Sequence, residues 1–374
     1  MIRINISQID TLFVDGGYPI EFLFYYKDKI NSKKIRKVLK ELSSSFWPLF
    51  GDYTEGSIQA SQYSEERFLT EIDYSEEFNS ACAEMDMWEK YHQINPQEME
   101  GMFHLSILQF NNGTVLIPKM NHLAGDGYSY FYFLAVLAAL SKSSYLPLKK
   151  YAIQKKTTPE IYRTALKQFH FDRSDVKEPF EHKNCKITIE KISKQSIDQE
   201  IRKINRENNT AVSQNDILSS MAAKKTFELQ NADIENQFTI SMPMDVRRRV
   251  KELGEKFFGN GLMFYHMEIS TGDLSEIDYN HLALKLRESM PSIDSDSYKK
   301  YLNELETRMR LSAQHYLKPY DPEKGCLITN LSRMPVHKLD FGSGYPDFVF
   351  LLTVGKNSTA ILADRDDYLL RFAN

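Results

Sequence analysis

The chain has 374 residues, of which 42% are hydrophobic and 26% charged, and its net charge at neutral pH is -4. This composition is typical of a globular protein with enough core for one large domain or two ordinary ones. The slightly acidic charge argues against a dedicated nucleic-acid binder and against a polybasic membrane binder. We therefore expect a soluble cytoplasmic protein with no nucleic-acid partner and no membrane partner.

The three cysteines, Cys82, Cys185 and Cys326, lie far apart and form no C-x-x-C pair. They indicate neither a disulfide framework nor a zinc site, so we expect no bound metal. The first ten residues show no charged-then-apolar signal segment. The apolar run that starts at Tyr128 is too short, and too rich in tyrosine, to span a bilayer.

The first half of the chain alternates between the side-chain patterns of strands and of helices. Aromatic and β-branched runs predict strands, and apolar residues at helical spacing predict helices. Ser32 is the expected N-cap of the first helix, and Pro48 and Gly51 end it. The expected elements are a strand at 18–26, a helix at 32–46, strands at 103–110 and 113–120, and a buried helix at 128–140.

The segment 121–127, Asn-His-Leu-Ala-Gly-Asp-Gly, joins the last of these strands to the buried helix. Gly125 and Gly127 relieve crowding and permit positive φ, so a tight turn can direct His122 into a cleft. A histidine held in this way suits general base catalysis near neutral pH. The alternative is that Asp126 only caps the helix and His122 is an ordinary turn residue. About one His-x-x-x-acid pair is expected by chance in this composition, so the spacing alone does not decide.

The remaining chain divides into a linker and a second half rich in strands and helices. Residues 141–184 are rich in Lys, Ser, Thr and Pro and predict a crossover linker, with a weak helix at 160–169. Ser213 and Asp216 resemble a capping box at the start of the next long helix. The other expected elements are strands at 186–192, 237–242, 262–269, 327–330, 348–354 and 359–363, and helices at 196–208, 217–229, 275–290 and 297–315. This order implies a two-domain mixed α/β architecture.

Taken together, the motifs resemble those of the BAHD acyltransferase family, within the chloramphenicol-acetyltransferase-like superfamily. The resemblance spans nearly the whole chain and keeps the order of the motifs. It is carried by Trp-Pro-Leu-Phe-Gly at 47–51, His-x-x-x-Asp-Gly at 122–127, Val-Ser-Gln-Asn-Asp-Ile-Leu at 212–218, Asp-Val-Arg-Arg-Arg at 245–249, Phe-Gly-Asn at 258–260 and Asp-Phe-Gly-Ser-Gly at 340–344.

The resemblance implies a monomer of two chloramphenicol-acetyltransferase-like domains, at residues 1–140 and 185–374, with the active site in the channel between them. It implies acyl transfer from an acyl-coenzyme A co-substrate to a hydroxyl or amine of a small-molecule acceptor, such as a specialised metabolite. The resemblance implies that neither a covalent acyl-enzyme nor a bound cofactor takes part. His122 would be the general base, and Asp126 would face away from the substrate and pair with Arg247.

Other family positions carry over as support or as binding residues. Gly127, Asp340 and Gly342 are expected to be structural, the last two far from the chemistry. The expected contacts to substrate or coenzyme A are Ser213, Asn215, Asn260, Thr329 and Asn330. The sequence departs from the family at Leu331, where an indole that donates to the oxyanion is common, and at Ser343, which replaces a Trp. Thr329 or Asn330 could donate to the oxyanion instead.

Two other functions fit parts of the sequence. A condensation-domain-like enzyme would take its acyl group from a carrier protein, but such domains commonly carry a second histidine where this chain has Asn121. A degenerate, non-catalytic scaffold is suggested by Leu331 and Ser343. The intact His122, Asp126 and Gly127 argue against the scaffold.

Overall fold

The computed structural model describes residues 2–13, 19–54, 56–92, 94, 101–143, 160–163, 185–230, 237–311 and 317–374. Most of the expected linker at 141–184 lies outside these ranges. Of its expected helix at 160–169, only α5 (Glu160–Arg163) is described. The domain boundaries drawn from the sequence therefore stay a prediction.

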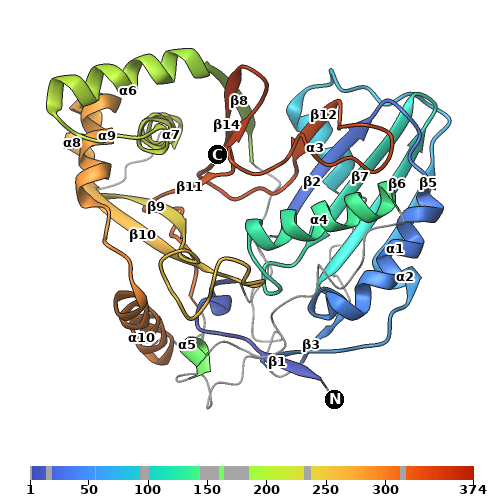
Figure 1. Cartoon of the computed structure of the whole chain (residues 1–374). Coiled ribbons are helices and arrows are strands. Elements are labelled where there is room, and N and C mark those ends of the chain that lie inside the picture. The colour runs from blue at the N-terminus through green and yellow to red at the C-terminus, as the bar shows by residue number, and fades with distance from the viewer. Residues whose placement is uncertain are drawn as a thin grey trace.

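Two large sheets form the frame of the molecule, one on each side in Figure 1. The five-stranded N-terminal sheet has the order β12 (Phe348–Leu351), β2 (Ile20–Tyr26), β7 (Gly113–Met120), β6 (Phe103–Phe110) and β5 (Leu69–Asp73). The six-stranded C-terminal sheet has the order β10 (Leu262–Ser270), β9 (Gln237–Asp245), β11 (Gly325–Asn330), β13 (Ser358–Ala363), β14 (Asp367–Ala373) and β8 (Ile187–Ser193). A small third sheet joins β1 (Arg3–Asn5), β4 (Ser57–Gln59) and β3 (Asp52–Thr54). The mixed α/β fold expected from the sequence is confirmed.

Helices cover the sheets because strand residues alternate between two apolar faces. On the N-terminal sheet, Phe22 and Phe24 face α1 (Ser32–Ser45) and α4 (Gly127–Lys142), whereas Leu23 and Tyr25 face α3 (Glu84–His92). The outer face of the C-terminal sheet packs against α6 (Lys194–Asn208), α7 (Gln214–Gln230) and α9 (Tyr279–Ser289). Its inner face turns toward the N-terminal half. The short α2 (Glu65–Phe68), α8 (Thr271–Glu276) and the longer α10 (Ser295–Leu311) complete the helices of the described ranges.

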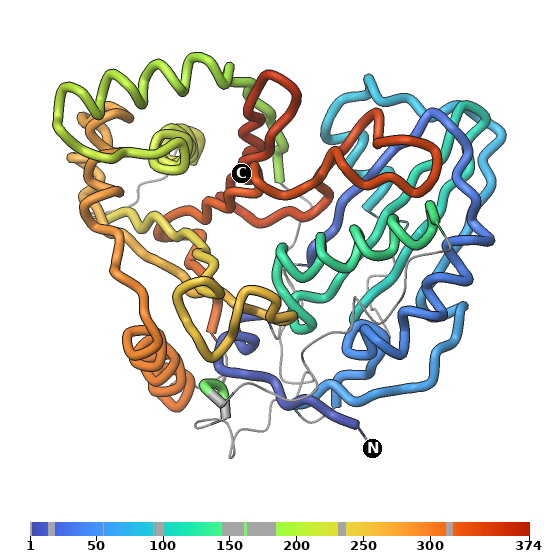
Figure 2. The backbone as a smooth tube through the Cα atoms, in the orientation of Figure 1, coloured from blue at the N-terminus to red at the C-terminus, as the bar shows by residue number. Residues whose placement is uncertain are grey.

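Two segments cross between the halves. β12 comes from the C-terminal half of the sequence but pairs antiparallel with β2, with Phe350 opposite Leu23. In the other direction, the segment at Asp10–Phe13 packs its Leu12 and Phe13 against β10 and α10. Figure 2 shows this blue segment beside the gold backbone of the C-terminal half. The two halves are thus tied together by chain exchange as well as by contact.

Several expected elements need correction. The N-cap of α1 is Asn31, not Ser32, because the Asn31 side chain accepts the backbone N–H of Lys34 at 3.2 Å. The single helix expected at 275–290 is two helices, α8 and α9, because Ile277 is extended and Asp278 caps α9 through the N–H groups of Asn280 and His281. Seven elements have no counterpart among those predicted from the sequence, namely β1, β3, β4, β5, β14, α2 and α3.

Gly325→Ala tests the packing that aligns β11 with β9. A Cβ at Gly325 would lie 1.9 Å from the carbonyl oxygen of Thr239, so one strand must move. We expect a loss of about 1–3 kcal/mol in the free energy of unfolding, measured by urea denaturation. Gly272→Ala, where a Cβ meets nothing within 4 Å, is the matched control. Equal stability of the two variants would contradict the packing argument.

Candidate active site

His122 lies in the turn between β7 and α4, as the sequence predicted. The turn is closed by Asn121, whose side chain accepts the N–H of Leu123 at 3.0 Å. Asp126 then caps α4, with its Oδ1 accepting the N–H of Ser129 at 3.1 Å. The turn is therefore held at both ends by side chains, and His122 is carried on a short, well-fixed loop.

Asp126 also forms a buried ion pair with Arg247 at 2.8 Å. The side chains of both residues are almost fully buried, so Arg247 is not a solvated surface residue. Arg247 donates further to the carbonyl oxygens of Phe257 at 2.9 Å and Gly259 at 2.7 Å, and Gly261 N–H donates to Asp126 at 3.0 Å. Asp126 is thus both a helix cap and the anchor that joins the turn to the loop after β9.

The glycines of the turn act differently from expectation. Neither Gly125 nor Gly127 has a positive φ, so the turn does not use that conformational freedom. Gly125 is needed for close approach instead, because a Cβ there would lie 2.7 Å from Ser129 Cβ and 3.4 Å from Gly259 Cα. Ser129 Oγ in turn receives the N–H of Gly259 at 2.9 Å. The two halves meet here almost backbone to backbone.

Asn260 fixes the tautomer of His122. Its Nδ2 donates to Asp10 Oδ1 at 2.8 Å and to the His122 carbonyl oxygen at 2.7 Å, so its Oδ1 is the atom that faces His122 Nδ1 at 3.1 Å. An amide oxygen can only accept, and Nδ1 therefore carries the proton. The other ring nitrogen, Nε2, is left as the base.

Asp10 and Phe13 complete the surroundings of the imidazole. The Asp10 carboxylate also accepts the N–H and hydroxyl of Ser7, at 2.6 and 2.7 Å. Phe13 stacks on the His122 ring with 3.7 Å between centroids and 14° between planes. These two residues were missed in the sequence because only the three-dimensional fold brings the first turn of the chain to His122. No local motif marks them.

Burial lowers the pKa of His122, and the negative charge of Asp126, the hydrogen bond with Asn260 and the charge of Asp10 raise it to a smaller extent. The balance keeps the imidazole neutral at pH 7, which is the form a general base requires. The ring is fixed by stacking on one face and by a hydrogen bond at Nδ1, so its basic nitrogen is held in one direction.

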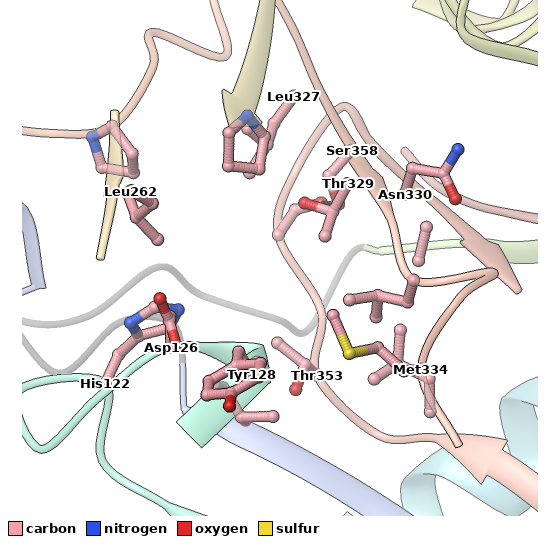
Figure 3. A pocket seen from close by; sticks show the side chains of 18 of the residues that line it. His122, Asp126, Tyr128, Leu262, Leu327, Thr329, Asn330, Met334, Thr353 and Ser358 are labelled. Atoms are coloured by element: carbon pink, nitrogen blue, oxygen red, sulfur yellow. Dashed lines mark hydrogen bonds between the residues drawn. The ribbon is translucent and has the colours of Figure 1, made fainter. Parts of the chain in front are cut away.

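A cavity of about 230 Å³ lies between the halves and is lined by His122. Figure 3 shows His122 and Tyr128 on one side of the cavity, with Thr329 and Asn330 across from them. Most of the remaining lining is apolar. Among the described residues, the hydroxyl of Thr329 makes no hydrogen bond, whereas the Asn330 amide donates to Asn215 at 2.8 Å and accepts the N–H of Ser332 at 3.0 Å.

Three of the residues expected to bind substrate or coenzyme A, namely Asn260, Ser213 and Asn215, do not line this cavity. Asn260 is buried and uses its amide on His122 and Asp10, so it holds the base instead of lining the cavity. The Ser213 hydroxyl donates to Asp216 at 2.8 Å and accepts from Arg287 at 2.7 Å at the start of α7. Asn215 reaches the cavity only through Asn330.

The Asp340 loop lies at the far end of α4. Asp340 pairs with Lys142, the last residue of that helix, and accepts the N–H groups of Gly342 at 2.8 Å and Gly344 at 3.1 Å. Gly342 has φ of 107°, which side chains rarely adopt. Because α4 has 16 residues, this loop is about 24 Å from the turn that carries His122. Asp340 and Gly342 therefore lie far from His122, as the resemblance implied.

No group of three or more His, Cys, Asp or Glu side chains within the described ranges is arranged to hold a metal ion. Within the same ranges, every helix is too short or too polar to cross a lipid bilayer.

Solved structures share this architecture along the whole chain. TRI101 of F. sporotrichioides, complexed with coenzyme A and T-2, aligns with a TM-score of 0.75 at 13% identity, covering 99% of this chain and 94% of that one. Vinorine synthase aligns with a TM-score of 0.75 at 17% identity, covering 99% and 89%. The first condensation domain of the CDA synthetase aligns at 0.59 and 10% identity, covering 99% and 89%. The fold is that of the chloramphenicol-acetyltransferase-like enzymes.

The family model described as "Transferase family" matches residues 66–367. The chain therefore belongs to the BAHD acyltransferase family, as its motifs indicated, and it is an acyltransferase. No curated protein matches its sequence.

Arg247→Met tests the buried ion pair. The variant leaves the Asp126 carboxylate in the interior without its cationic partner, and breaking such a pair costs about 3–5 kcal/mol. We expect urea denaturation to show a loss of that size in the free energy of unfolding. Arg248→Met, at a side chain that is 84% exposed, should change stability by less than about 0.5 kcal/mol. If the Arg247→Met variant is as stable as the parent, the ion pair does not anchor the turn.

Asp10→Asn tests the contact behind the base. The variant removes a negative charge that raises the pKa of His122 and disturbs the acceptor of Asn260. We expect the acid limb of the kcat/KM profile to move to lower pH, and its plateau to fall. Asp28→Asn, on an exposed side chain, is the control and should move neither. An acid limb that stays in place, or moves to higher pH, would contradict the electrostatic link.

Proposed function

We propose that this enzyme transfers an acyl group from an acyl-coenzyme A thioester to a hydroxyl or amine of a small-molecule acceptor, such as a specialised metabolite. The observation that carries the proposal is the imidazole of His122, whose Nδ1 is held by Asn260 and which lines the cavity between the halves. The choice of thioester is supported by TRI101, a structural relative whose complex contains coenzyme A.

The reaction needs only proton transfer and carbonyl addition. His122 Nε2 takes the proton of the acceptor hydroxyl or amine as that atom forms a bond to the thioester carbonyl carbon. The carbonyl becomes a tetrahedral oxyanion. When it collapses, the carbon–sulfur bond breaks, and the thiolate takes the proton from His122, which returns to its neutral form. No covalent acyl-enzyme is required.

The oxyanion needs a hydrogen-bond donor, and Thr329 is our candidate. The sequence left Thr329 and Asn330 open for this role. The Asn330 amide is already committed to Asn215 and Ser332, whereas the Thr329 hydroxyl lines the cavity and makes no hydrogen bond within the described ranges. Asn330 lines the cavity and holds Asn215 of α7 behind it.

His122→Ala is the decisive variant. We expect kcat to fall about 10²–10⁴-fold, because a positioned base contributes that much, while the unfolding midpoint stays within a few degrees of the parent. The assay is thiol release from acyl-coenzyme A in the presence of a panel of alcohols and amines. His281→Ala, at an exposed histidine paired with Asp278, is the matched control and should keep the full rate.

A His122→Ala variant with near wild-type rate would overturn the proposal. The donor is tested in the same assay. If an acylated carrier protein supports transfer and acyl-coenzyme A does not, the base keeps its role but the donor class changes.

A further inference from the structure

Arg371 is a buried cation in the wall of the cavity that contains His122. It lies on β14, whose Leu370 and Phe372 face the helices on the outer side of the C-terminal sheet. Because side chains alternate along a strand, Arg371 points to the opposite side, toward the N-terminal half. Its relative exposure is only 2%.

The guanidinium group is largely without partners. Nη1 donates to the Thr353 carbonyl oxygen at 3.0 Å, and the group lies 5.4 Å from the centre of the Phe350 ring. Nε and Nη2 are buried and have no hydrogen-bond acceptor among the residues that the structure describes. Within the described ranges, no Asp or Glu forms an ion pair with Arg371. Burial lowers its pKa to about 10, so the side chain remains a cation at neutral pH.

An unpaired buried charge opposes folding, because the ion loses its hydration and gains no counterion. The side chain lies beside the ring of Phe350, and its partner on β13 is Ala360, so a methionine of similar length could replace it among apolar neighbours. The presence of an arginine at this position is therefore not explained by stability. It is explained if an anion occupies the site when substrate is bound.

The geometry of the unpaired atoms specifies the anion. Nε and Nη2 form one edge of the planar guanidinium group, the edge that receives a carboxylate through two parallel hydrogen bonds. The remaining donor edge is held by Thr353 through Nη1. A single carboxylate therefore matches the two donors that remain free, Nε and Nη2.

We propose that Arg371 binds a carboxylate carried by a substrate of the transfer reaction, so that one substrate is a dicarboxylic acyl thioester or an acceptor that bears an acid group. The proposal rests on the proposed function and refines it. It makes Arg371 a specificity residue. Arg371 takes no part in proton transfer.

The experiment compares matched substrate pairs in two arms. In the donor arm, the wild-type enzyme is titrated calorimetrically with succinyl- and butyryl-coenzyme A, and with glutaryl- and valeryl-coenzyme A. In the acceptor arm, acetyl-coenzyme A is the donor, and hydroxy acids are compared with their amides by thiol release. Each arm is repeated with Arg371→Met, Arg371→Lys and the control Arg365→Met, an exposed residue on the turn between β13 and β14.

We expect one arm to favour the carboxylate-bearing member by roughly 10–100-fold in the wild type, as charged hydrogen bonds provide. Arg371→Met should abolish the preference while keeping the neutral partner active, and Arg371→Lys should keep part of it. Arg365→Met should behave as wild type. The Arg371→Met variant should unfold at or above the wild-type temperature, since it loses an unpaired buried charge.

Three results would overturn the proposal. They are a preference that survives in Arg371→Met, no preference in either arm, and an Arg371→Met variant that unfolds earlier and loses neutral and acidic substrates equally. If coenzyme A and all its esters fail to bind, the proposed function fails instead. Free glutarate, titrated against wild type and Arg371→Met, then decides the Arg371 site alone: Arg371-dependent binding supports it and equal binding, or none, overturns it.

Discussion

The ion pair between Asp126 and Arg247 is the interaction on which the site depends. It lies at the meeting point of the catalytic turn and the loop that follows β9, and both partners are shielded from water. An ion pair in the interior is rarely the most stabilising choice for such a position. Here the ion pair fixes positions. Each buried charge is stable only beside its partner, and the pair also holds the peptide groups of Phe257, Gly259 and Gly261 in place.

The base is assembled from three distant parts of the chain. The turn after β7 supplies His122, the loop before β10 supplies Asn260, and the first residues of the chain supply Asp10 and Phe13. This arrangement meets two requirements for a general base: the imidazole must be neutral, and it must still be basic. Burial favours the neutral imidazole, while the carboxylates and the amide around it keep it basic enough to accept a proton. No single segment could satisfy both demands from its own side chains.

The sequence indicated the parts of the structure that local patterns encode. The bounds of β6 and β7 were predicted correctly because their apolar runs are bordered by Gly101 and by the turn at Gly113, and α4 was predicted because its apolar run is long. The short β5 and the polar α3 gave weak patterns and were missed. Asp126 and Arg247 came together as the family motifs implied. The Phe-Gly-Asn motif marked Asn260 as a site residue. Its position beside His122 depends on a contact between residues 138 positions apart in the sequence, which no local pattern can show.

The exchange of β12 into the N-terminal sheet has a consequence for biosynthesis. Until β12 leaves the ribosome, β2 is an unpaired sheet edge on its β12 side, and such edges template aggregation. The first half therefore cannot finish folding as it is made, and closure of its sheet waits for the same C-terminal segment that then continues into β13 and β14. The order in which the strands are synthesised therefore differs from the order in which they can pair. We expect chaperones to protect the nascent N-terminal half until β12 is available.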